Sequence, residues 1–271
     1  MGNIKKIGIA GTGAIGTTVA QALSRGDIPG FKLAGIAASS QARSDALNAT
    51  LSTPVPFMSF GELANECDWV LEGLPPALFV DLARPVLSAG KVLIVLSCSQ
   101  LLEHQDLIPH AQEHGARIVV PSGAMLGFDA LKAAAVGEIH SVVIETRKPV
   151  AGLIKAPYLA QEKIDLTGIT EAVRIIEGSV TEVARVFPAN VNVAAALSLA
   201  GIGPDRTRME VWADPTLDRN THTVRVTSDS SDFTVAIQGR PSAKNPATGR
   251  ITPLSVIAML QNQSATLRIG T

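Results

Sequence analysis

The sequence has few cysteines and almost no net charge. Cys67 and Cys98 are the only cysteines among 271 residues, and they form no C-x-x-C pair. Neither a disulfide framework nor a zinc site is therefore expected. Lysine plus arginine (23) nearly balances aspartate plus glutamate (24), which leaves a net charge of −1. This balance gives no reason to expect nucleic acid or an anionic membrane as a partner, and it suits a small-molecule site.

Long apolar runs are also missing. No run approaches the roughly 18 residues that a membrane span requires, and the N-terminus enters a strand pattern without the apolar core of a signal peptide. We therefore expect a soluble cytoplasmic protein that does not associate with membranes. Apolar residues make up 46% of the chain, which is enough for the core of one large domain or two modest ones.

A glycine-rich turn near the N-terminus predicts a dinucleotide site. Residues 6–16 read K-I-G-I-A-G-T-G-A-I-G, a short apolar strand pattern that runs through G-x-G-x-x-G into a helical pattern. The first glycine permits a tight turn, the second lets the backbone approach a phosphate, and the third lets helix and strand pack closely. Free N–H groups at the helix start suit a pyrophosphate; a plain tight turn is the alternative. The residues concerned are Gly11, Gly13, Ala14, Ile15 and Gly16.

The end of the second expected strand, over residues 31–38, bears on cofactor choice. An NAD-selective site usually places a carboxylate there for the ribose 2′-hydroxyl, whereas this chain offers Ser39, Ser40 and Arg43. Hydroxyls beside a guanidinium can bind a 2′-phosphate through charge-assisted hydrogen bonds, so we expect NADP to be accepted as well as NAD. The alternative is that the two serines cap the next helix.

Strand and helix patterns alternate up to residue 121. Helices are expected over 61–66, 76–89 and 101–114, and strands over 68–72, 91–96 and 116–120. This alternation of strands and helices predicts a doubly wound parallel sheet, which forms a Rossmann-type dinucleotide-binding domain spanning residues 1–121. The loops at 74–76 and 97–99 should line the crevice beside the nicotinamide. Glu72 precedes that crevice, either as a functional group or as an ordinary strand-end carboxylate.

The remaining residues predict a smaller α+β catalytic domain over 122–252. A small-residue helix is expected from Gly123 and Ala124, with a longer helix over 169–185 and strands over 141–147, 208–212, 223–228 and 232–238. A final helix over 253–263 should return to the first domain, so that residues 253–271 pack on it. The fold class expected for the whole chain is α/β.

Six segments, in order along nearly the whole chain, resemble the L-aspartate dehydrogenase family. They are P-S-G-A at 121–124, E-T-R-K-P at 145–149, E-G-S-V-T-E-V-A at 177–184, F-P-A-N-V-N-V-A at 187–194, A-D-P-T-L-D-R-N-T-H at 213–222 and N-P-A-T at 245–248. The resemblance implies NAD- or NADP-dependent oxidative deamination of L-aspartate to iminoaspartate, then oxaloacetate and ammonia, or the reverse amination, linked to NAD biosynthesis. Some relatives carry an aspartate near Ser39 and Ser40, which leaves the cofactor preference open.

The same resemblance assigns residues. The family's catalytic histidine falls on His222, and its nicotinamide-side contacts fall on the Ala124 backbone N–H and on Asn190. Asn220 and Thr248 lie in the matching motifs as candidate substrate residues, and Asp214 lies there too. Amine oxidation needs a base near the substrate nitrogen, and imidazole titrates close to neutrality. Alternation along residues 220–226 points His222 inward with Val224 and Val226, although an inward histidine can also be purely structural.

Other charged and metal-binding residue types are less informative. Arg147 and Lys148 are the nearest candidates for the substrate carboxylates, with solvent-exposed strand-end charges as the alternative. His104, His110 and His114 fall on one expected helix without an H-E-x-x-H pattern, which favours a solvated face and no metal. A homo-oligomer is expected. Two other functions remain open: a dehydrogenase of another small amino or hydroxy acid, and a catalytically silent NADP(H) sensor.

Overall fold

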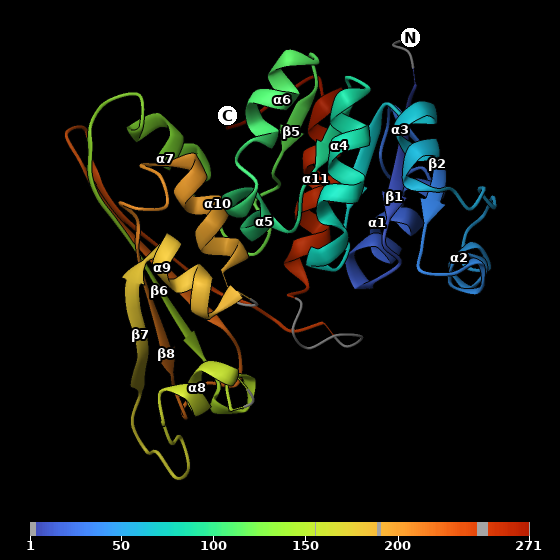
Figure 1. The fold of residues 1–271 in the computed structure, drawn as a ribbon. Helices are drawn as coiled ribbons and strands as arrows, with labels where there is room; N and C mark the ends of the chain where they lie inside the picture. The colour runs from blue at the N-terminus through green and yellow to red at the C-terminus, as the bar shows by residue number, and fades with distance from the viewer. Residues whose placement is uncertain (1–3, 155, 189–190, 243–248, 271) are drawn as a thin grey trace. The chain divides into compact units, whose positions relative to one another are not determined.

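The structure is a computed structural model that describes residues 4–154, 156–188, 191–242 and 249–270 (Figure 1). The chain divides into two compact units. The first contains Met1–Gly123 and Thr252–Ile269, and the second contains Ala124–Ile251 and Gly270–Thr271. Each unit is built around its own five-stranded sheet.

The first unit contains a parallel sheet in the order β2-β1-β3-β4-β5. Ile7 and Ile9 are fully buried in β1, as expected for strands that are covered on both faces. Beyond β2, Ile36 forms an isolated parallel bridge with Phe57. The strands are β1 (Lys5–Ala10), β2 (Phe31–Ala37), β3 (Trp69–Glu72), β4 (Val92–Ile94) and β5 (Arg117–Val119).

Helices cover this sheet. The last helix of the chain belongs to this unit: Val256 and Leu260 are fully buried in one cluster with Ile7 and Ile9, and the Gln261 side chain donates to the carbonyl oxygen of Asp27 at 2.7 Å. The helices are α1 (Ala14–Ser24), α2 (Gln41–Asn48), α3 (Phe60–Glu66), η1 (Pro76–Leu78), α4 (Phe79–Ser88), α5 (Cys98–Glu103), α6 (Leu107–Glu113) and α11 (Ile251–Ser264).

The single helix expected over residues 101–114 is wrong, because the chain forms α5 and α6 with a break at residues 104–106. His104 ends α5 with non-helical dihedrals, φ −120° and ψ 55°. Pro109 then lies in the first turn of α6, where a missing N–H costs nothing; in a continuous helix it would remove an interior hydrogen bond. The proline therefore favours a new helix start.

The second unit contains a mixed sheet in the order β10-β9-β6-β8-β7. β6 pairs in parallel with β8 and antiparallel with β9. α9 packs on β7 and β8, and α10 packs on α7 and α9. The elements are α7 (Phe128–Ala134), β6 (Ile139–Lys148), η2 (Val150–Gly152), α8 (Pro157–Gln161), β7 (Val173–Ser179), α9 (Val180–Val186), α10 (Asn192–Ala200), β8 (Arg208–Ala213), β9 (Thr221–Ser228) and β10 (Asp232–Gln238).

Two expected helices of this unit differ from the structure. Residues 173–179 of the expected helix 169–185 form strand β7, and the helix begins only at Val180. Ser179 and Glu182 mark that start with a reciprocal capping box. The helix expected from Gly123 and Ala124 begins at Phe128 instead, after Gly127 with φ +81°.

The α/β fold class is confirmed: a five-stranded parallel sheet in one unit and a second sheet with helices in the other. Among the helices that the described residues form, none is both long and apolar enough to cross a lipid bilayer.

Candidate active site

The glycine turn between β1 and α1 is tightly packed at two positions and open at the third. A Cβ on Gly11, whose φ is +107°, would lie 2.2 Å from the Gly73 carbonyl oxygen, and one on Gly16 would lie 2.0 Å from the Gly11 oxygen. A Cβ on Gly13 would meet nothing within 4 Å. Gly13 is the N-cap of α1 and has no side-chain acceptor, so the first amides, including those of Ala14 and Ile15, are available to an anion.

The residues after β2 are arranged as a helix start. Ser39 and Ser40 are exposed, and the Ser40 hydroxyl oxygen accepts from the backbone N–H of Arg43 at 3.3 Å, capping α2. Ser40 therefore caps the next helix, as the alternative interpretation of the two serines expected. The exposed side chain of Arg43 makes no hydrogen bond or ion pair with any described residue. A guanidinium at the start of α2 is thus accessible to a phosphate.

Glu72 is a structural carboxylate at the end of β3. It is fully buried, and its oxygens accept from the N–H of Leu74 at 2.8 Å, the N–H of Leu96 at 3.0 Å, and the N–H and hydroxyl of Ser97 at 2.9 Å each. Four donors satisfy the buried charge. Glu72 thereby holds together the two loops that were expected to line the nicotinamide crevice.

In the second unit, His222 lies on β9 directly opposite Thr146 of β6. The alternating burial of β9 puts His222, Val224 and Val226 on the buried face, as the sequence predicted. The His222 side chain is 7% exposed, and its Nδ1 lies 3.0 Å from the Thr146 hydroxyl. Lys148 follows two residues after Thr146 on the same face and is 8% exposed.

Burial sets the protonation of this pair. Desolvation, with a smaller contribution from the charge of Lys148, lowers the pKa of His222 to about 4. Desolvation also lowers the pKa of Lys148 to about 8. At neutral pH His222 is therefore an uncharged imidazole with one lone pair, while most Lys148 side chains carry a proton. A neutral base beside a cation suits a substrate that must lose a proton and also carries carboxylates.

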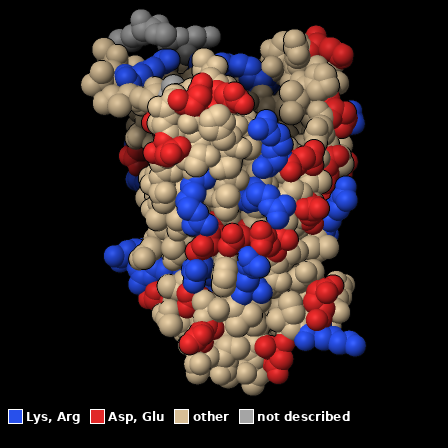
Figure 2. All heavy atoms as spheres, turned by 90° about the vertical axis from the view of Figure 1, so that its left-hand side faces the viewer, with Lys and Arg blue, Asp and Glu red and all other residues tan. Residues whose placement is uncertain are grey.

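Arg147 points to the opposite face of the sheet. Its Nε donates to Glu145 at 2.6 Å, its Nη1 donates to Asp214 at 3.4 Å, and its guanidinium lies 4.8 Å from the centre of the Trp212 ring. The hydrogen bond to Glu145 is the main reason that the pKa of Arg147 is raised. Because these contacts lie on the other face of the sheet, Arg147 is not brought together with His222. Figure 2 shows basic and acidic side chains interspersed on the face turned to the viewer.

The other candidate residues have varied surroundings. Asp214 is buried, and its pKa is lowered mainly by the hydrogen bond from the Thr216 hydroxyl. The Asn220 carbonyl oxygen accepts from the Gly239 N–H at 2.9 Å, immediately before β9. Ala124 is half-buried in a turn, so it has no helix N-terminus of its own, and the N–H of neighbouring Gly123 is taken by the Ser255 hydroxyl at 3.0 Å. Asn190 and Thr248 lie outside the described residues.

Comparison with known proteins places this geometry in a family. Residues 129–263 match the family model described as Aspartate dehydrogenase, C-terminal, and residues 11–121 match Homoserine dehydrogenase, NAD binding domain. L-aspartate dehydrogenase 3 of Bordetella bronchiseptica is 46% identical over 265 residues, covering 98% of this chain and 97% of that protein. The chain belongs to the L-aspartate dehydrogenase family.

A second relative agrees with this membership in the L-aspartate dehydrogenase family, and a solved structure shares the fold. The L-aspartate dehydrogenase of Bradyrhizobium diazoefficiens is 44% identical, covering 98% of this chain and 94% of that protein. The crystal structure of aspartate dehydrogenase from Thermotoga maritima has a TM-score of 0.75 at 22% identity, with 98% of this chain and 99% of that chain covered. At this identity the structural match supports the shared fold.

Thr146 is the residue of this family member that the sequence analysis missed. It lies within E-T-R-K-P, where the neighbouring cations drew attention instead. Period-two alternation was the available signal, because it places Thr146 and Lys148 on one face and Arg147 on the other. What the sequence did not contain was the pairing of Thr146 with His222, 76 residues away.

Proposed function

We propose that this protein is an NAD(P)-dependent L-aspartate dehydrogenase. The reaction converts L-aspartate and the oxidised cofactor to iminoaspartate, the reduced cofactor and a proton; water then releases oxaloacetate and ammonia. The observation that carries the proposal is His222, a buried and uncharged imidazole held by Thr146 in a chain 46% identical to an L-aspartate dehydrogenase. A link to NAD biosynthesis, through iminoaspartate as product, forms part of the proposal.

The two parts of the chain have separate tasks in this proposal. Residues 1–121, with 253–271, bind the dinucleotide, and the turn from Gly11 to Gly16 holds its pyrophosphate. The bound nicotinamide supplies the hydride acceptor. Residues 122–252 hold the substrate, with Ala124 and Asn190 on the nicotinamide side and Asn220 and Thr248 beside the substrate.

Protons are handled by His222. Its lone pair takes the proton of the substrate ammonium, which leaves an amine whose electrons can assist departure of the Cα hydride. The imidazolium that forms then has its proton available, and the same ring can later activate water at the imine. Thr146 keeps the ring in place, because its hydroxyl bonds one ring nitrogen and leaves the other to face substrate.

Lys148 binds a substrate carboxylate in this scheme, and Arg147 does not. The support is geometric, since Lys148 shares the His222 face, whereas Arg147 is paired with Glu145 and Asp214 on the other. With a pKa of about 8, Lys148 retains its charge at neutral pH and loses it under alkaline conditions. Substrate affinity should therefore weaken above about pH 8 through this group.

NADP is accepted alongside NAD in this proposal. Ser39, Ser40 and Arg43 stand where an NAD-selective enzyme has a carboxylate, and the Arg43 side chain is exposed at the start of α2. The Ser40 cap does not conflict with phosphate binding, because a hydroxyl that accepts from an N–H still has its own proton to donate.

The deciding experiment follows absorbance of the reduced nicotinamide with purified protein, L-aspartate and either NAD or NADP. D-aspartate, L-glutamate and L-malate are the substrate controls, and His222→Ala is the variant. Reduction with L-aspartate alone, lost in the variant, would support both the reaction and the base. Turnover of another acid would redirect the substrate assignment. Tight NADPH binding without turnover of any acid would overturn the enzyme proposal and favour a sensor.

We also propose a cytoplasmic homo-oligomer with an even number of subunits. Both Cys67 and Cys98 are free and buried, and burial raises their thiol pKa values to about 11 and about 12, which suits unreactive thiols in a reducing compartment. Closed symmetry is the general tendency of soluble enzymes. Light scattering after size exclusion measures the assembly, and a monomeric mass would contradict it.

A further inference from the structure

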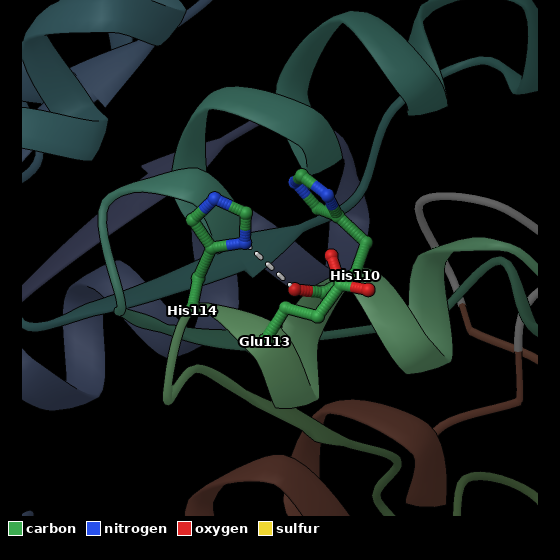
Figure 3. A group of neighbouring side chains, drawn as sticks. All are labelled: His110, Glu113 and His114. Atoms are coloured by element: carbon green, nitrogen blue, oxygen red, sulfur yellow. Dashed lines mark hydrogen bonds between the residues drawn. The ribbon is translucent and has the colours of Figure 1, made fainter.

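The last turn of helix α6 and its C-cap residue, His114, carry a cluster of metal-ligating side chains that the proposed reaction does not use. His110, Glu113 and His114 each offer one ligand atom, and these atoms lie within 4.8 Å of one another (Figure 3). The sequence reads H-A-Q-E-H over residues 110–114. Spacings of three and four residues put all three side chains on one helix face. His104 stays apart, because it ends α5 and its ring stacks on Phe79 at 6.4 Å.

Hydrogen bonds already orient His114 as a ligand. Its Nδ1 lies 2.9 Å from the His110 carbonyl oxygen, the bond dashed in Figure 3. A carbonyl oxygen only accepts, so Nδ1 must carry the proton and Nε2 must carry the lone pair. Metal-binding histidines typically donate their other ring N–H to a carbonyl or carboxylate in this way.

His110 has a similar support from another helix. Its Nε2 lies 2.9 Å from the hydroxyl of Ser88, at the end of α4. When Nε2 donates to this hydroxyl, Nδ1 holds the lone pair. Glu113 completes the set, since its exposed carboxylate makes no hydrogen bond or ion pair with any described residue. Sequence alone favoured a solvated face, but it showed neither of these fixed ring orientations.

We propose that His110, Glu113 and His114 bind a divalent transition-metal ion of the zinc class. Two imidazole nitrogens and one carboxylate oxygen are a donor set that zinc accepts, with water in the fourth position. Bond lengths of about 2.0–2.2 Å require the three ligand atoms to draw together, and rotation of the exposed Glu113 side chain brings its carboxylate toward the two imidazoles. The site lies on the surface of the first unit, whereas His222 belongs to the second.

Zinc binding to the purified, chelator-treated protein tests the proposal, by calorimetry or by competition with a chromophoric chelator at pH 7.5. We expect one ion per chain at this site. His114→Ala should abolish it, and Glu113→Gln and Ser88→Ala should each weaken it by about 10-fold, the latter because a group that orients a ligand is lost.

His140→Ala is the matched control. His140 is an exposed histidine whose Nδ1 lies 4.0 Å from Glu138, and its loss should leave the affinity unchanged. Unfolding temperatures in chelator must agree among the variants, so that a folding defect is separated from a lost ligand. Absence of binding to the wild type would overturn the proposal, as would equal binding by the wild type, His114→Ala and Glu113→Gln.

Discussion

The burial of His222 makes the stability of this protein fall as the pH falls. The pKa of this group is lowered from an ordinary value near 6.5 to about 4 in the fold. Between these values the unfolded chain binds more protons than the folded one, so stability falls as pH falls from about 6.5 to about 4. The difference corresponds to about 3 kcal/mol. His222→Asn, which cannot titrate, should lack this part of the acid destabilisation in urea unfolding at pH 7 and pH 4.5. If the wild type and His222→Asn lost the same free energy of unfolding between pH 7 and pH 4.5, the burial of a neutral imidazole would be contradicted.

Lys148 destabilises the folded protein at neutral pH, and its proposed role in substrate binding explains this cost. A pKa lowered from 10.5 to about 8 by desolvation means that the charged form is less favourable in the fold than in the unfolded chain at neutral pH. We expect Lys148→Met to raise the free energy of unfolding by about 1–3 kcal/mol at pH 7, and to raise the KM for L-aspartate by at least 10-fold. The gain should shrink as pH rises from 8 to 10.5, because the folded wild type then recovers stability. A stabilised variant with an unchanged KM would remove Lys148 from substrate binding.

A substitution at Ser40 can change the preference between NAD and NADP while it keeps the N-cap of α2. Ser40→Asp keeps an acceptor for the Arg43 N–H, since aspartate is as good an N-cap as serine, but adds a negative charge where a 2′-phosphate would lie. We expect the KM for NADP to rise by about 10-fold or more with little change for NAD. Arg43→Ala should raise the KM for NADP in the same way. Equal effects on the two cofactors in Ser40→Asp would place the 2′-phosphate elsewhere.

Glu72 shows how one side chain can hold two elements together. It joins the ends of β3 and β4 by accepting four hydrogen bonds at 2.8–3.0 Å. Glu72→Gln replaces one acceptor oxygen by an NH2 group that faces donors, so we expect a loss of about 3 kcal/mol in the free energy of unfolding. Glu66→Gln, at an exposed ion pair of 3.9 Å with Lys6, should change stability by less than about 0.5 kcal/mol. Similar losses in both variants would show that the Glu72 bonds add little.

The elements differ in how far sequence could predict them. Parallel strands such as β4 were predicted because strands that are buried on both faces are mostly apolar and alternate with helices along the chain. β7 was missed because V-R-I-I-E-G-S runs directly into a true helix, and only the capping box at Ser179 marks the change. The separate start of α6 could have been predicted from Pro109. Proline is tolerated in the first turn of a helix but not in its interior, so its position favours a new helix over a continuous one.

At the scale of the whole molecule, pairing between distant segments was beyond sequence pattern. The antiparallel pairing of β6 with β9 brings Thr146 beside His222, while β8 pairs in parallel on the other side of β6. Alternation fixes which face each residue takes, but not which strand is its neighbour. The fold class and the inward orientation of His222 were therefore predictable from motifs and from the alternation of the strand, whereas the hydroxyl that contacts this histidine depended on tertiary pairing.

The last helix links the two ends of the chain within the first unit. α11 follows the second unit in sequence, yet Leu260 is fully buried among the side chains of β1 and α1. We expect Leu260→Ala to lower the free energy of unfolding by about 2–4 kcal/mol and to weaken dinucleotide binding, measured by urea unfolding and by NADPH fluorescence titration. Leu254 on the same helix is 56% exposed, so Leu254→Ala should stay within about 0.5 kcal/mol of the wild type. Because both substitutions change helix propensity by the same small amount, in favour of alanine, equal effects would show that burial of Leu260 adds no stability to the nucleotide-binding unit.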